Sequence, residues 1–304
     1  MSVRTILVAA GALACGAAAA QQDDYSKVEI KSEKLVDNLY VMTGAGGNMA
    51  LLTGPDGAVL VDDQFAPLAP KIRTAIAALT DKPVRFVINT HSHFDHTGGN
   101  EAFGKAGSVI VAQDNSLKRL TTKQLIDFFN IEVPPMPKAG LPIVTFPQSL
   151  SLHLNGEDID AVHAPNAHTD NDAILYFRNA NVVHMGDVVQ GPYYGFIDMG
   201  IGGSIDGVVR AVAEMLSRTD ADTRYIAGHA APMSRPELEA WHAMMVTVRK
   251  RVADAIAAGK TQEEVLASKP TREFDERYEK GFLKADQWVQ RLYVDLRKAV
   301  PPKR

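Results

Sequence analysis

The amino-acid sequence predicts an α/β protein with a four-layer α/β/β/α sandwich, in which two sheets pack face to face and helices cover both outer faces. Short apolar runs separated by turn residues occur in two groups, and each group is followed by segments with helical periodicity. The 304 residues, 46% hydrophobic and 22% charged, suffice for one large domain. No linker separates the halves, so we expect a single domain over residues 21–304 with helices at its C-terminal end.

The first half of the chain begins with a predicted strand meander. Its strands are expected at residues 27–35, 38–43, 48–53 and 58–62. Helices and strands then alternate: a helix over 68–79, a strand over 84–88, a helix over 100–106, a strand over 109–112 and a helix over 114–120. Residues 121–147 are richer in Pro and aromatic residues, and we interpret them as an irregular, partly helical excursion.

The second half repeats this plan. A second meander is expected, with strands at residues 150–154, 159–163, 173–177 and 182–185. An amphipathic helix, a strand and two further helices complete the chain, at residues 205–218, 224–227, 235–258 and 285–300.

The first twenty residues have the features of a secretory signal peptide. Arg4 precedes an apolar run, and an Ala-rich stretch ends at Ala20, the expected cleavage site. The apolar run is too short to span a bilayer, so we expect no transmembrane segment in the mature chain and a periplasmic or secreted location. The only cysteine, Cys15, lies inside this segment, which leaves a mature chain without disulfides or thiolate ligands. A lipid anchor at Cys15 is disfavoured, because Ala12 stands where a lipobox usually has Leu.

The formal net charge of −4, without a basic stripe, argues against a nucleic-acid partner. A small-molecule substrate is the expected partner. The sequence does not indicate the oligomeric state.

Residues 90–100 read THSHFDHTGGN and follow a fully apolar run. Buried imidazoles need polar partners, so this crowding indicates a site rather than core packing. Alternate residues of an extended segment point the same way, so His91 and His93 can converge on one point. Asp95 and His96 lie beyond the strand end and can converge on a second point nearby. Imidazole nitrogens and carboxylate oxygens are the usual Zn²⁺ ligands in a cysteine-free protein.

Each metal ion needs about three protein ligands, so further ligands must come from other strand ends. Three residues follow β-like runs where loops begin: His168, Asp187 and His229. The remaining histidines are expected to be structural or exposed: His153, His163, His184 and His242. Asp170 and Asp172 are expected to form hydrogen bonds within their loop.

These residues, in this order, resemble the motif set of the metallo-β-lactamase-fold hydrolase superfamily, in its glyoxalase II-like branch. The resemblance covers about residues 34–229 and implies the metallo-β-lactamase sandwich with two Zn²⁺ ions, Fe or Mn²⁺ being alternatives. One ion would be held by His91, His93 and His168. The other would be held by Asp95, His96 and His229. Asp187 would bridge both ions, and Asp62 would orient the motif loop or a ligand histidine.

The resemblance also implies a hydrolase that cleaves a small ester, lactone, thioester or amide with a hydroxide shared by the two metals, and the signal peptide implies that this hydrolase is exported. Asp95 would be the catalytic proton carrier. His93 stands where the oxygen-reducing di-iron branch usually has Glu, which favours hydrolysis. Gln190 stands where one β-lactamase subclass has a carboxylate-gripping Lys, so β-lactams are a disfavoured substrate. The alternative from another class is a metal-dependent ligand-binding or sensing protein without turnover.

Three segments are candidates for the pocket walls: residues 44–48, the Phe128–Phe129 pair and the aromatic, glycine-rich residues 191–196. Core packing of each aromatic residue is the competing interpretation.

Overall fold

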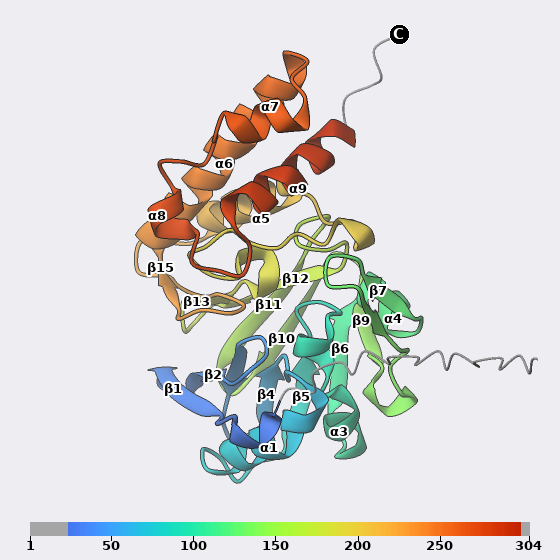
Figure 1. Cartoon of the computed structure of the whole chain (residues 1–304). Helices are drawn as coiled ribbons and strands as arrows, with labels where there is room; N and C mark the ends of the chain where they lie inside the picture. The colour runs from blue at the N-terminus through green and yellow to red at the C-terminus, as the bar shows by residue number, and fades with distance from the viewer. Residues whose placement is uncertain (1–23, 299–304) are drawn as a thin grey trace, which may run out of the picture.

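The computed structural model describes residues 24–298, so the signal peptide predicted over residues 1–20 lies outside the described part of the chain. Two sheets stack face to face, and helices flank them on both outer sides (Figure 1). The four-layer α/β/β/α sandwich predicted from the sequence is confirmed.

The first sheet has the strand order β1-β2-β3-β4-β5-β6-β9. Its strands are β1 (Lys31–Val36), β2 (Leu39–Thr43), β3 (Met49–Leu52), β4 (Ala58–Val61), β5 (Val84–Ile88), β6 (Val109–Gln113) and β9 (Val144–Phe146). The first four form an antiparallel meander, and the last three extend it in parallel. Parallel neighbours need crossover connections, which contain α1 (Ala69–Ala77), α2 (Phe94–Thr97), α3 (Asn100–Lys105) and α4 (Asp114–Leu120).

The second sheet has the order β10-β11-β12-β13-β14-β15. Its strands are β10 (Ser149–Leu154), β11 (Glu157–Ala164), β12 (Asp172–Phe177), β13 (Val182–His184), β14 (Arg224–Ile226) and β15 (Met233–Ser234). Its outer face is covered by the helices of the second half, α5 (Ile205–Arg218), α6 (Arg235–Ala257), α7 (Gln262–Ala267), α8 (Asp275–Tyr278) and α9 (Ala285–Lys298) (Figure 1). Short 3-10 turns complete the set: η1 (Tyr25–Lys27), η2 (Ala66–Leu68), η3 (Lys138–Gly140), η4 (Gly186–Val189) and η5 (Met199–Ile201).

The apolar strands are buried on both faces. Leu39 and Val41 of β2 pack into the core between the sheets, whereas their neighbour Met42 packs under α1 and α3. Because successive side chains of a strand point to opposite faces, a strand covered on both sides must be apolar at nearly every position. This layering fixes where each strand ends, and the loops beyond those ends carry the polar residues.

Residues 121–147 correct the sequence-based expectation. Instead of a partly helical excursion they contain a two-stranded hairpin, β7 (Gln124–Ile126) and β8 (Ile131–Val133), then η3 and the sheet strand β9. Strands of three residues carry too little periodicity to be recognised, so the prediction was wrong for most of this segment. The short elements α7, α8 and β15 were not predicted either.

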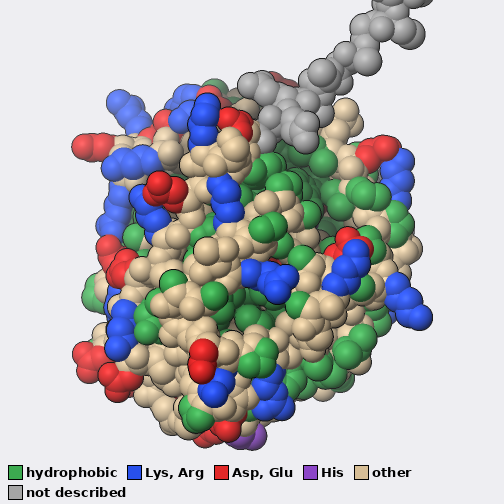
Figure 2. Space-filling model, turned by 90° about the horizontal axis from the view of Figure 1, so that it is seen from below, with side chains coloured by type: hydrophobic (Ala, Val, Ile, Leu, Met, Phe, Trp, Pro, Cys, Tyr) green, Lys and Arg blue, Asp and Glu red, His purple; other side chains and the backbone are tan. Residues whose placement is uncertain are grey.

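None of the helices within residues 24–298 combines the length and the apolarity that crossing a bilayer requires. The face shown in Figure 2 is that of α1 and α3, and its Lys and Arg side chains are scattered among acidic, apolar and neutral ones.

Candidate metal centre

The residues predicted as metal ligands lie in four segments that meet at one edge of the sandwich. In each segment the first predicted ligand comes three or four positions after the end of a strand, and these strands are β5, β11, β13 and β14. The motif after β5 supplies four of the side chains, and the other strand ends supply His168, Asp187 and His229. Overlapping groups of these side chains place their donor atoms within 4.8 Å of one another.

The first group consists of His91, His93 and His168, all buried. His93 Nδ1 and His168 Nε2 are 3.1 Å apart. His91 Nε2 is buried and has no hydrogen-bond partner among residues 24–298. A buried nitrogen without a partner is costly, and a cation between these rings would remove that cost.

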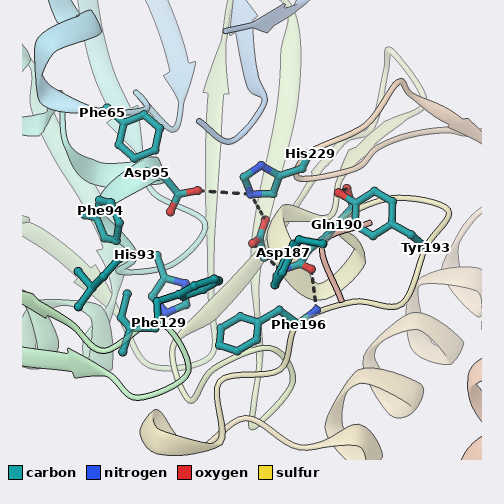
Figure 3. A pocket seen from close by; sticks show the side chains of 13 residues that line it. Phe65, His93, Phe94, Asp95, Phe129, Asp187, Gln190, Tyr193, Phe196 and His229 are labelled. Atoms are coloured by element: carbon teal, nitrogen blue, oxygen red, sulfur yellow. Dashed lines mark hydrogen bonds and ion pairs between the residues drawn. The ribbon is translucent and has the colours of Figure 1, made fainter. Parts of the chain in front are cut away.

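The second group consists of Asp95, His96 and His229. Asp95 and His229 line a cavity (Figure 3), and His96 is buried beside them. The Nε2 atoms of the two histidines are 3.3 Å apart. Asp95 Oδ2 lies 3.6 Å from His96 Nε2 and 3.4 Å from His229 Nε2. These three donor atoms form a nearly regular triangle.

Asp187 lies between the two groups and faces both. Its Oδ1 is 3.3 Å from the Nε2 atoms of His96 and His229, and its Oδ2 is 3.8 Å from His168 Nε2. Oδ1 is buried and has no hydrogen-bond partner in the described part of the chain. Gln190 Nε2 donates to Oδ2 at 2.9 Å and holds the carboxylate in this orientation.

The donor atoms fit divalent metal ions. Ligands at about 2.0–2.1 Å from a tetrahedral Zn²⁺ lie about 3.3 Å from one another. The Nε2 atoms of His96 and His229 lie 3.3 to 3.6 Å from each other, from Asp95 Oδ2 and from Asp187 Oδ1, close to that value. The second group with Asp187 therefore has the dimensions of one coordination shell, and the first group with Asp187 can form another.

The histidines are held in the tautomers that metal binding requires. His96 Nδ1 donates to Asp62 Oδ2 at 2.8 Å, and His168 Nδ1 donates to the Phe196 carbonyl at 2.8 Å. His93 Nε2 donates to Asp198 Oδ2 at 3.0 Å. In each ring the proton lies on the nitrogen that faces away from the centre, so the other nitrogen presents its lone pair inward.

Asp62 supports the rings of both His96 and His91, in agreement with its expected role. Its oxygens accept from the backbone N–H and the hydroxyl of Thr90, both at 2.7 Å. Because the Thr90 hydroxyl donates to Asp62, its oxygen accepts from His91 Nδ1 at 3.1 Å. One buried carboxylate thus fixes the tautomers of His91 and His96 together.

Electrostatics divide the site into two kinds of imidazole. Burial, followed by the neighbouring rings of His96 and His93, lowers the pKa of His91 well below its usual value. Burial also lowers the pKa of His168 to about 4. At neutral pH both rings are unprotonated, as metal ligation requires. At His96 burial acts in the same direction, but the carboxylates of Asp187 and Asp95 outweigh it and raise its pKa. The electric field of these carboxylates therefore stabilises a positive charge, either a proton or a metal ion, beside His96.

Two glycines let the backbone approach the ligands closely. A Cβ on Gly228 would lie 2.0 Å from Asp187 Oδ1, and one on Gly47 would lie 2.1 Å from His96 Cε1. The adjacent Asn48 joins the halves of the molecule, since its side-chain amide donates to the carbonyls of Ala227 and Ala230 at 2.8 and 2.6 Å. The loop over residues 44–48 therefore secures the site rather than lining its cavity.

A cavity of about 320 Å³ opens over the second group (Figure 3). Its walls are mostly aromatic and aliphatic: Phe65, Phe94, Ile126, Phe129, Ile131, Tyr193, Phe196 and Phe282. Two of the three predicted wall segments, the Phe128–Phe129 pair and residues 191–196, contribute to it. Gln190 links the last segment to the centre, because its Oε1 accepts from the Phe196 N–H at 2.7 Å.

The other histidines have separate partners, as expected. His163 and His242 contact the carbonyls of Asp170 and Val209, and His184 contacts that of Asn48. His153 is exposed and pairs with Asp158. The two loop carboxylates accept hydrogen bonds within their loop as expected, Asp170 from Asn171 and Asp172 from Thr169. Asp170 also pairs with Arg119 of α4, outside the loop.

Asp198 is a functional residue that sequence reasoning missed. It lies 105 residues from His93 along the chain and follows no motif, so no sequence signal points to it. Its side chain is buried, and it bonds the His93 nitrogen that faces away from the centre.

We expect Asp198→Asn to weaken metal affinity about 10–100-fold, because the amide cannot hold the His93 tautomer as the carboxylate does. Competition with a chromophoric chelator measures this affinity. Asp158→Asn is the matched control, since it alters an exposed Asp–His pair and should leave affinity unchanged. Equal affinities for both variants would contradict the positioning role of Asp198.

Comparison with known proteins agrees with this geometry. The family model described as the metallo-beta-lactamase superfamily matches residues 42–229. The chain is 24% identical over 231 residues to the 2,4-dinitroanisole O-demethylase subunit alpha of Nocardioides sp. (strain JS1661), covering 75% of this chain and 66% of that protein. It is 26% identical over 176 residues to the linear primary-alkylsulfatase of Pseudomonas sp. (strain ATCC 19151), covering 47% of this chain and 33% of that protein. A metallo-beta-lactamase type 2 of Elizabethkingia meningoseptica is 26% identical over 171 residues, covering 53% of this chain and 63% of that protein.

Solved structures share the fold. The metallo-beta-lactamase from Pontibacter korlensis superposes with a TM-score of 0.59 at 16% identity, covering 71% of this chain and 99% of that one. The sec-alkylsulfatase Pisa1 from Pseudomonas sp. has a TM-score of 0.67 at 18% identity, covering 87% of this chain and 50% of that one. The chain spans about two thirds or less of each of the curated relatives above.

Proposed function

Because this chain belongs to the metallo-beta-lactamase superfamily, we propose that it is an exported dinuclear zinc hydrolase that cleaves a small-molecule ester, lactone, thioester or amide. The observation that carries the proposal is the position of Asp187, whose two oxygens face two separate sets of imidazoles beneath a small-molecule cavity. A single structural ion would not need a carboxylate shared in this way.

The chemistry divides between the metal pair and the chain. When bound, the metals supply Lewis acidity and an activated water nucleophile at neutral pH. His91, His93 and His168 would hold one ion, and Asp95, His96 and His229 the other, with Asp187 shared. Zn²⁺ suits this imidazole and carboxylate set, and the same donors also accept Fe or Mn²⁺.

Asp95 is the residue placed to move a proton. Its Oδ2 faces His96 and His229, whereas its Oδ1 has no hydrogen-bond partner among residues 24–298 and the side chain lines the cavity. Oδ1 can therefore take a proton from the attacking water and deliver it to the leaving group. The aromatic walls exclude bulk water, which strengthens these charge interactions.

Two features support a substrate other than a β-lactam. Gln190 replaces the lysine expected for gripping a carboxylate, and its amide is already engaged by Asp187 and the Phe196 N–H. Two of the proteins named above are metallo-beta-lactamases, but the other three are a 2,4-dinitroanisole O-demethylase subunit and two alkylsulfatases. Nitrocefin should consequently be a poor substrate beside an ester or a lactone.

The test is a substrate screen of the purified zinc-loaded protein with 4-nitrophenyl esters, an acyl-homoserine lactone, a thioester and nitrocefin. We expect turnover of at least one ester or lactone that chelation abolishes and added Zn²⁺ restores. Tight, stoichiometric metal binding without turnover of any substrate would instead support a ligand-binding or sensing protein.

Export is part of the proposal and rests on residues 1–20. Mass spectrometry of the mature protein should find Gln21 at the N-terminus. A diacylated Cys15 at that position would replace export in free form by a lipid-anchored location.

A further inference from the structure

The mouth of the cavity carries exposed apolar side chains. Three of the eight large apolar residues that are exposed within residues 24–298 line this one cavity: Phe129, Ile131 and Phe282, at 45%, 38% and 52% exposure. Apolar residues scattered singly over a surface need no explanation, but their gathering at one opening indicates a binding surface. The hairpin β7–β8 supplies two of them, and the loop before α9 supplies the third.

These side chains belong to an aromatic cluster that continues to the metal centre. The ring of Phe129 lies 5.5 Å from that of Phe282 and 5.4 Å from that of Phe196. Phe196 is buried, and its ring lies 5.8 Å from His168 and 6.5 Å from His93. Ring contacts thus connect the exposed Phe129 and Phe282 through Phe196 to the first group of histidines. Figure 3 shows Phe129 and Phe196 close to His93.

The cluster is supported from behind. The guanidinium of Arg291 lies 4.9 Å from the ring centre of Phe128 and 4.8 Å from that of Phe196. Arg291 also donates to the Ile197 carbonyl at 2.6 Å. Rings held in this way need little ordering when a ligand arrives, which favours binding.

No fixed cation lines the cavity. Its His and Asp lining residues, His93, Asp95, Asp187 and His229, all belong to the metal centre, and among residues 24–298 no Lys or Arg lines the cavity. Arg291, although close, is covered by the aromatic rings and does not line the cavity. A negatively charged substituent away from the reacting bond would lose its hydration without gaining a partner.

We propose that this site selects uncharged esters or lactones with an apolar acyl or aryl group, and that Phe129 and Phe282 determine this specificity. The inference rests on the proposed hydrolase function and adds to it the substrate class. The reacting bond lies over the metal centre, and the apolar group lies against Phe196 and the two exposed rings.

The first test compares substrates that differ in one property. 4-Nitrophenyl acetate, butanoate and hexanoate vary chain length, and the adipate monoester replaces the terminal methyl group of the hexanoate chain by a carboxylate. We expect kcat/KM to rise up to about fourfold per methylene. The adipate monoester should be at least about tenfold poorer than the hexanoate.

The matched variants are F129A/F282A and I143A. Ile143 is 74% exposed but does not line the cavity. We expect the double variant to lose the increase with chain length, whereas I143A keeps it. A chain-length dependence that survives in F129A/F282A, or an adipate monoester turned over as well as the hexanoate, would overturn the inference and leave the hydrolase proposal standing.

The second test does not depend on turnover. The neutral fluorescent probe N-phenyl-1-naphthylamine should bind the zinc-loaded protein and I143A with equal affinity, and F129A/F282A at least about fivefold more weakly. If no ester is cleaved but probe binding follows this order, the apolar selectivity is supported and the hydrolase function fails. Equal probe affinity in all three proteins would overturn the selectivity.

Discussion

Asp187→Ala is expected to reduce kcat/KM by at least about 10³-fold and to lower the bound metal from about two ions to about one per chain. Among residues 24–298 this carboxylate is the group whose oxygens face both ligand sets, at 3.3 and 3.8 Å. Lewis-acid stabilisation contributes several kcal/mol, and each 1.36 kcal/mol corresponds to a factor of ten in rate.

Metal analysis and steady-state kinetics on the same preparation measure this effect. Asp187→Asn keeps the shape of the side chain and one oxygen but removes the negative charge. We expect it to reduce kcat/KM by a similar factor. Asp158→Ala, at an exposed carboxylate, is the control and should retain full activity. Two tightly bound ions and near-normal kcat/KM in Asp187→Ala would show that the two sets of ligands do not share this residue.

Removal of the metal is expected to lower the melting temperature by about 10 °C. The buried His91 Nε2 and Asp187 Oδ1 have no protein partner among residues 24–298, so a metal that binds only the folded state adds stability. At a free metal concentration about 1,000 times Kd this amounts to about 4 kcal/mol, and about 2–4 °C correspond to each kcal/mol in domains of this size class.

Thermal unfolding followed by circular dichroism, with and without a chelator, measures the shift. Adding Zn²⁺ after chelation should restore the original transition, which excludes irreversible damage. The His91→Ala variant provides the control. Because it has one ligand fewer, chelation should lower its melting temperature by less. Identical melting temperatures for chelated and zinc-loaded protein would argue against a metal centre at these residues.

Local patterns account for most of what could be predicted. Residues 84–96 contain both the end of an apolar strand and four candidate ligands. The rule that side chains alternate along an extended segment then separates His91 and His93 from the residues beyond the turn. The remaining ligands could be found because each also follows an apolar strand by three or four residues.

Contacts between distant segments account for what could not be predicted. Strand β9 has three residues and exists because it pairs with β6 in register, Val144 beside Val111. The position of Asp198 likewise depends on the path of the chain from Asp187 through the aromatic segment back to His93. Neither leaves a local periodicity, and both follow only from the assembled fold.

The amide bridges that Asn48 makes to Ala227 and Ala230 have a consequence for how the protein matures. His96 and His229 are 133 residues apart along the chain, and they meet only where this loop joins the two halves. Before the two halves dock, the candidate ligands that lie close together are therefore those of the local motif from His91 to His96. We therefore expect loading with metal to follow the docking of one half on the other, in whichever compartment the chain completes its folding.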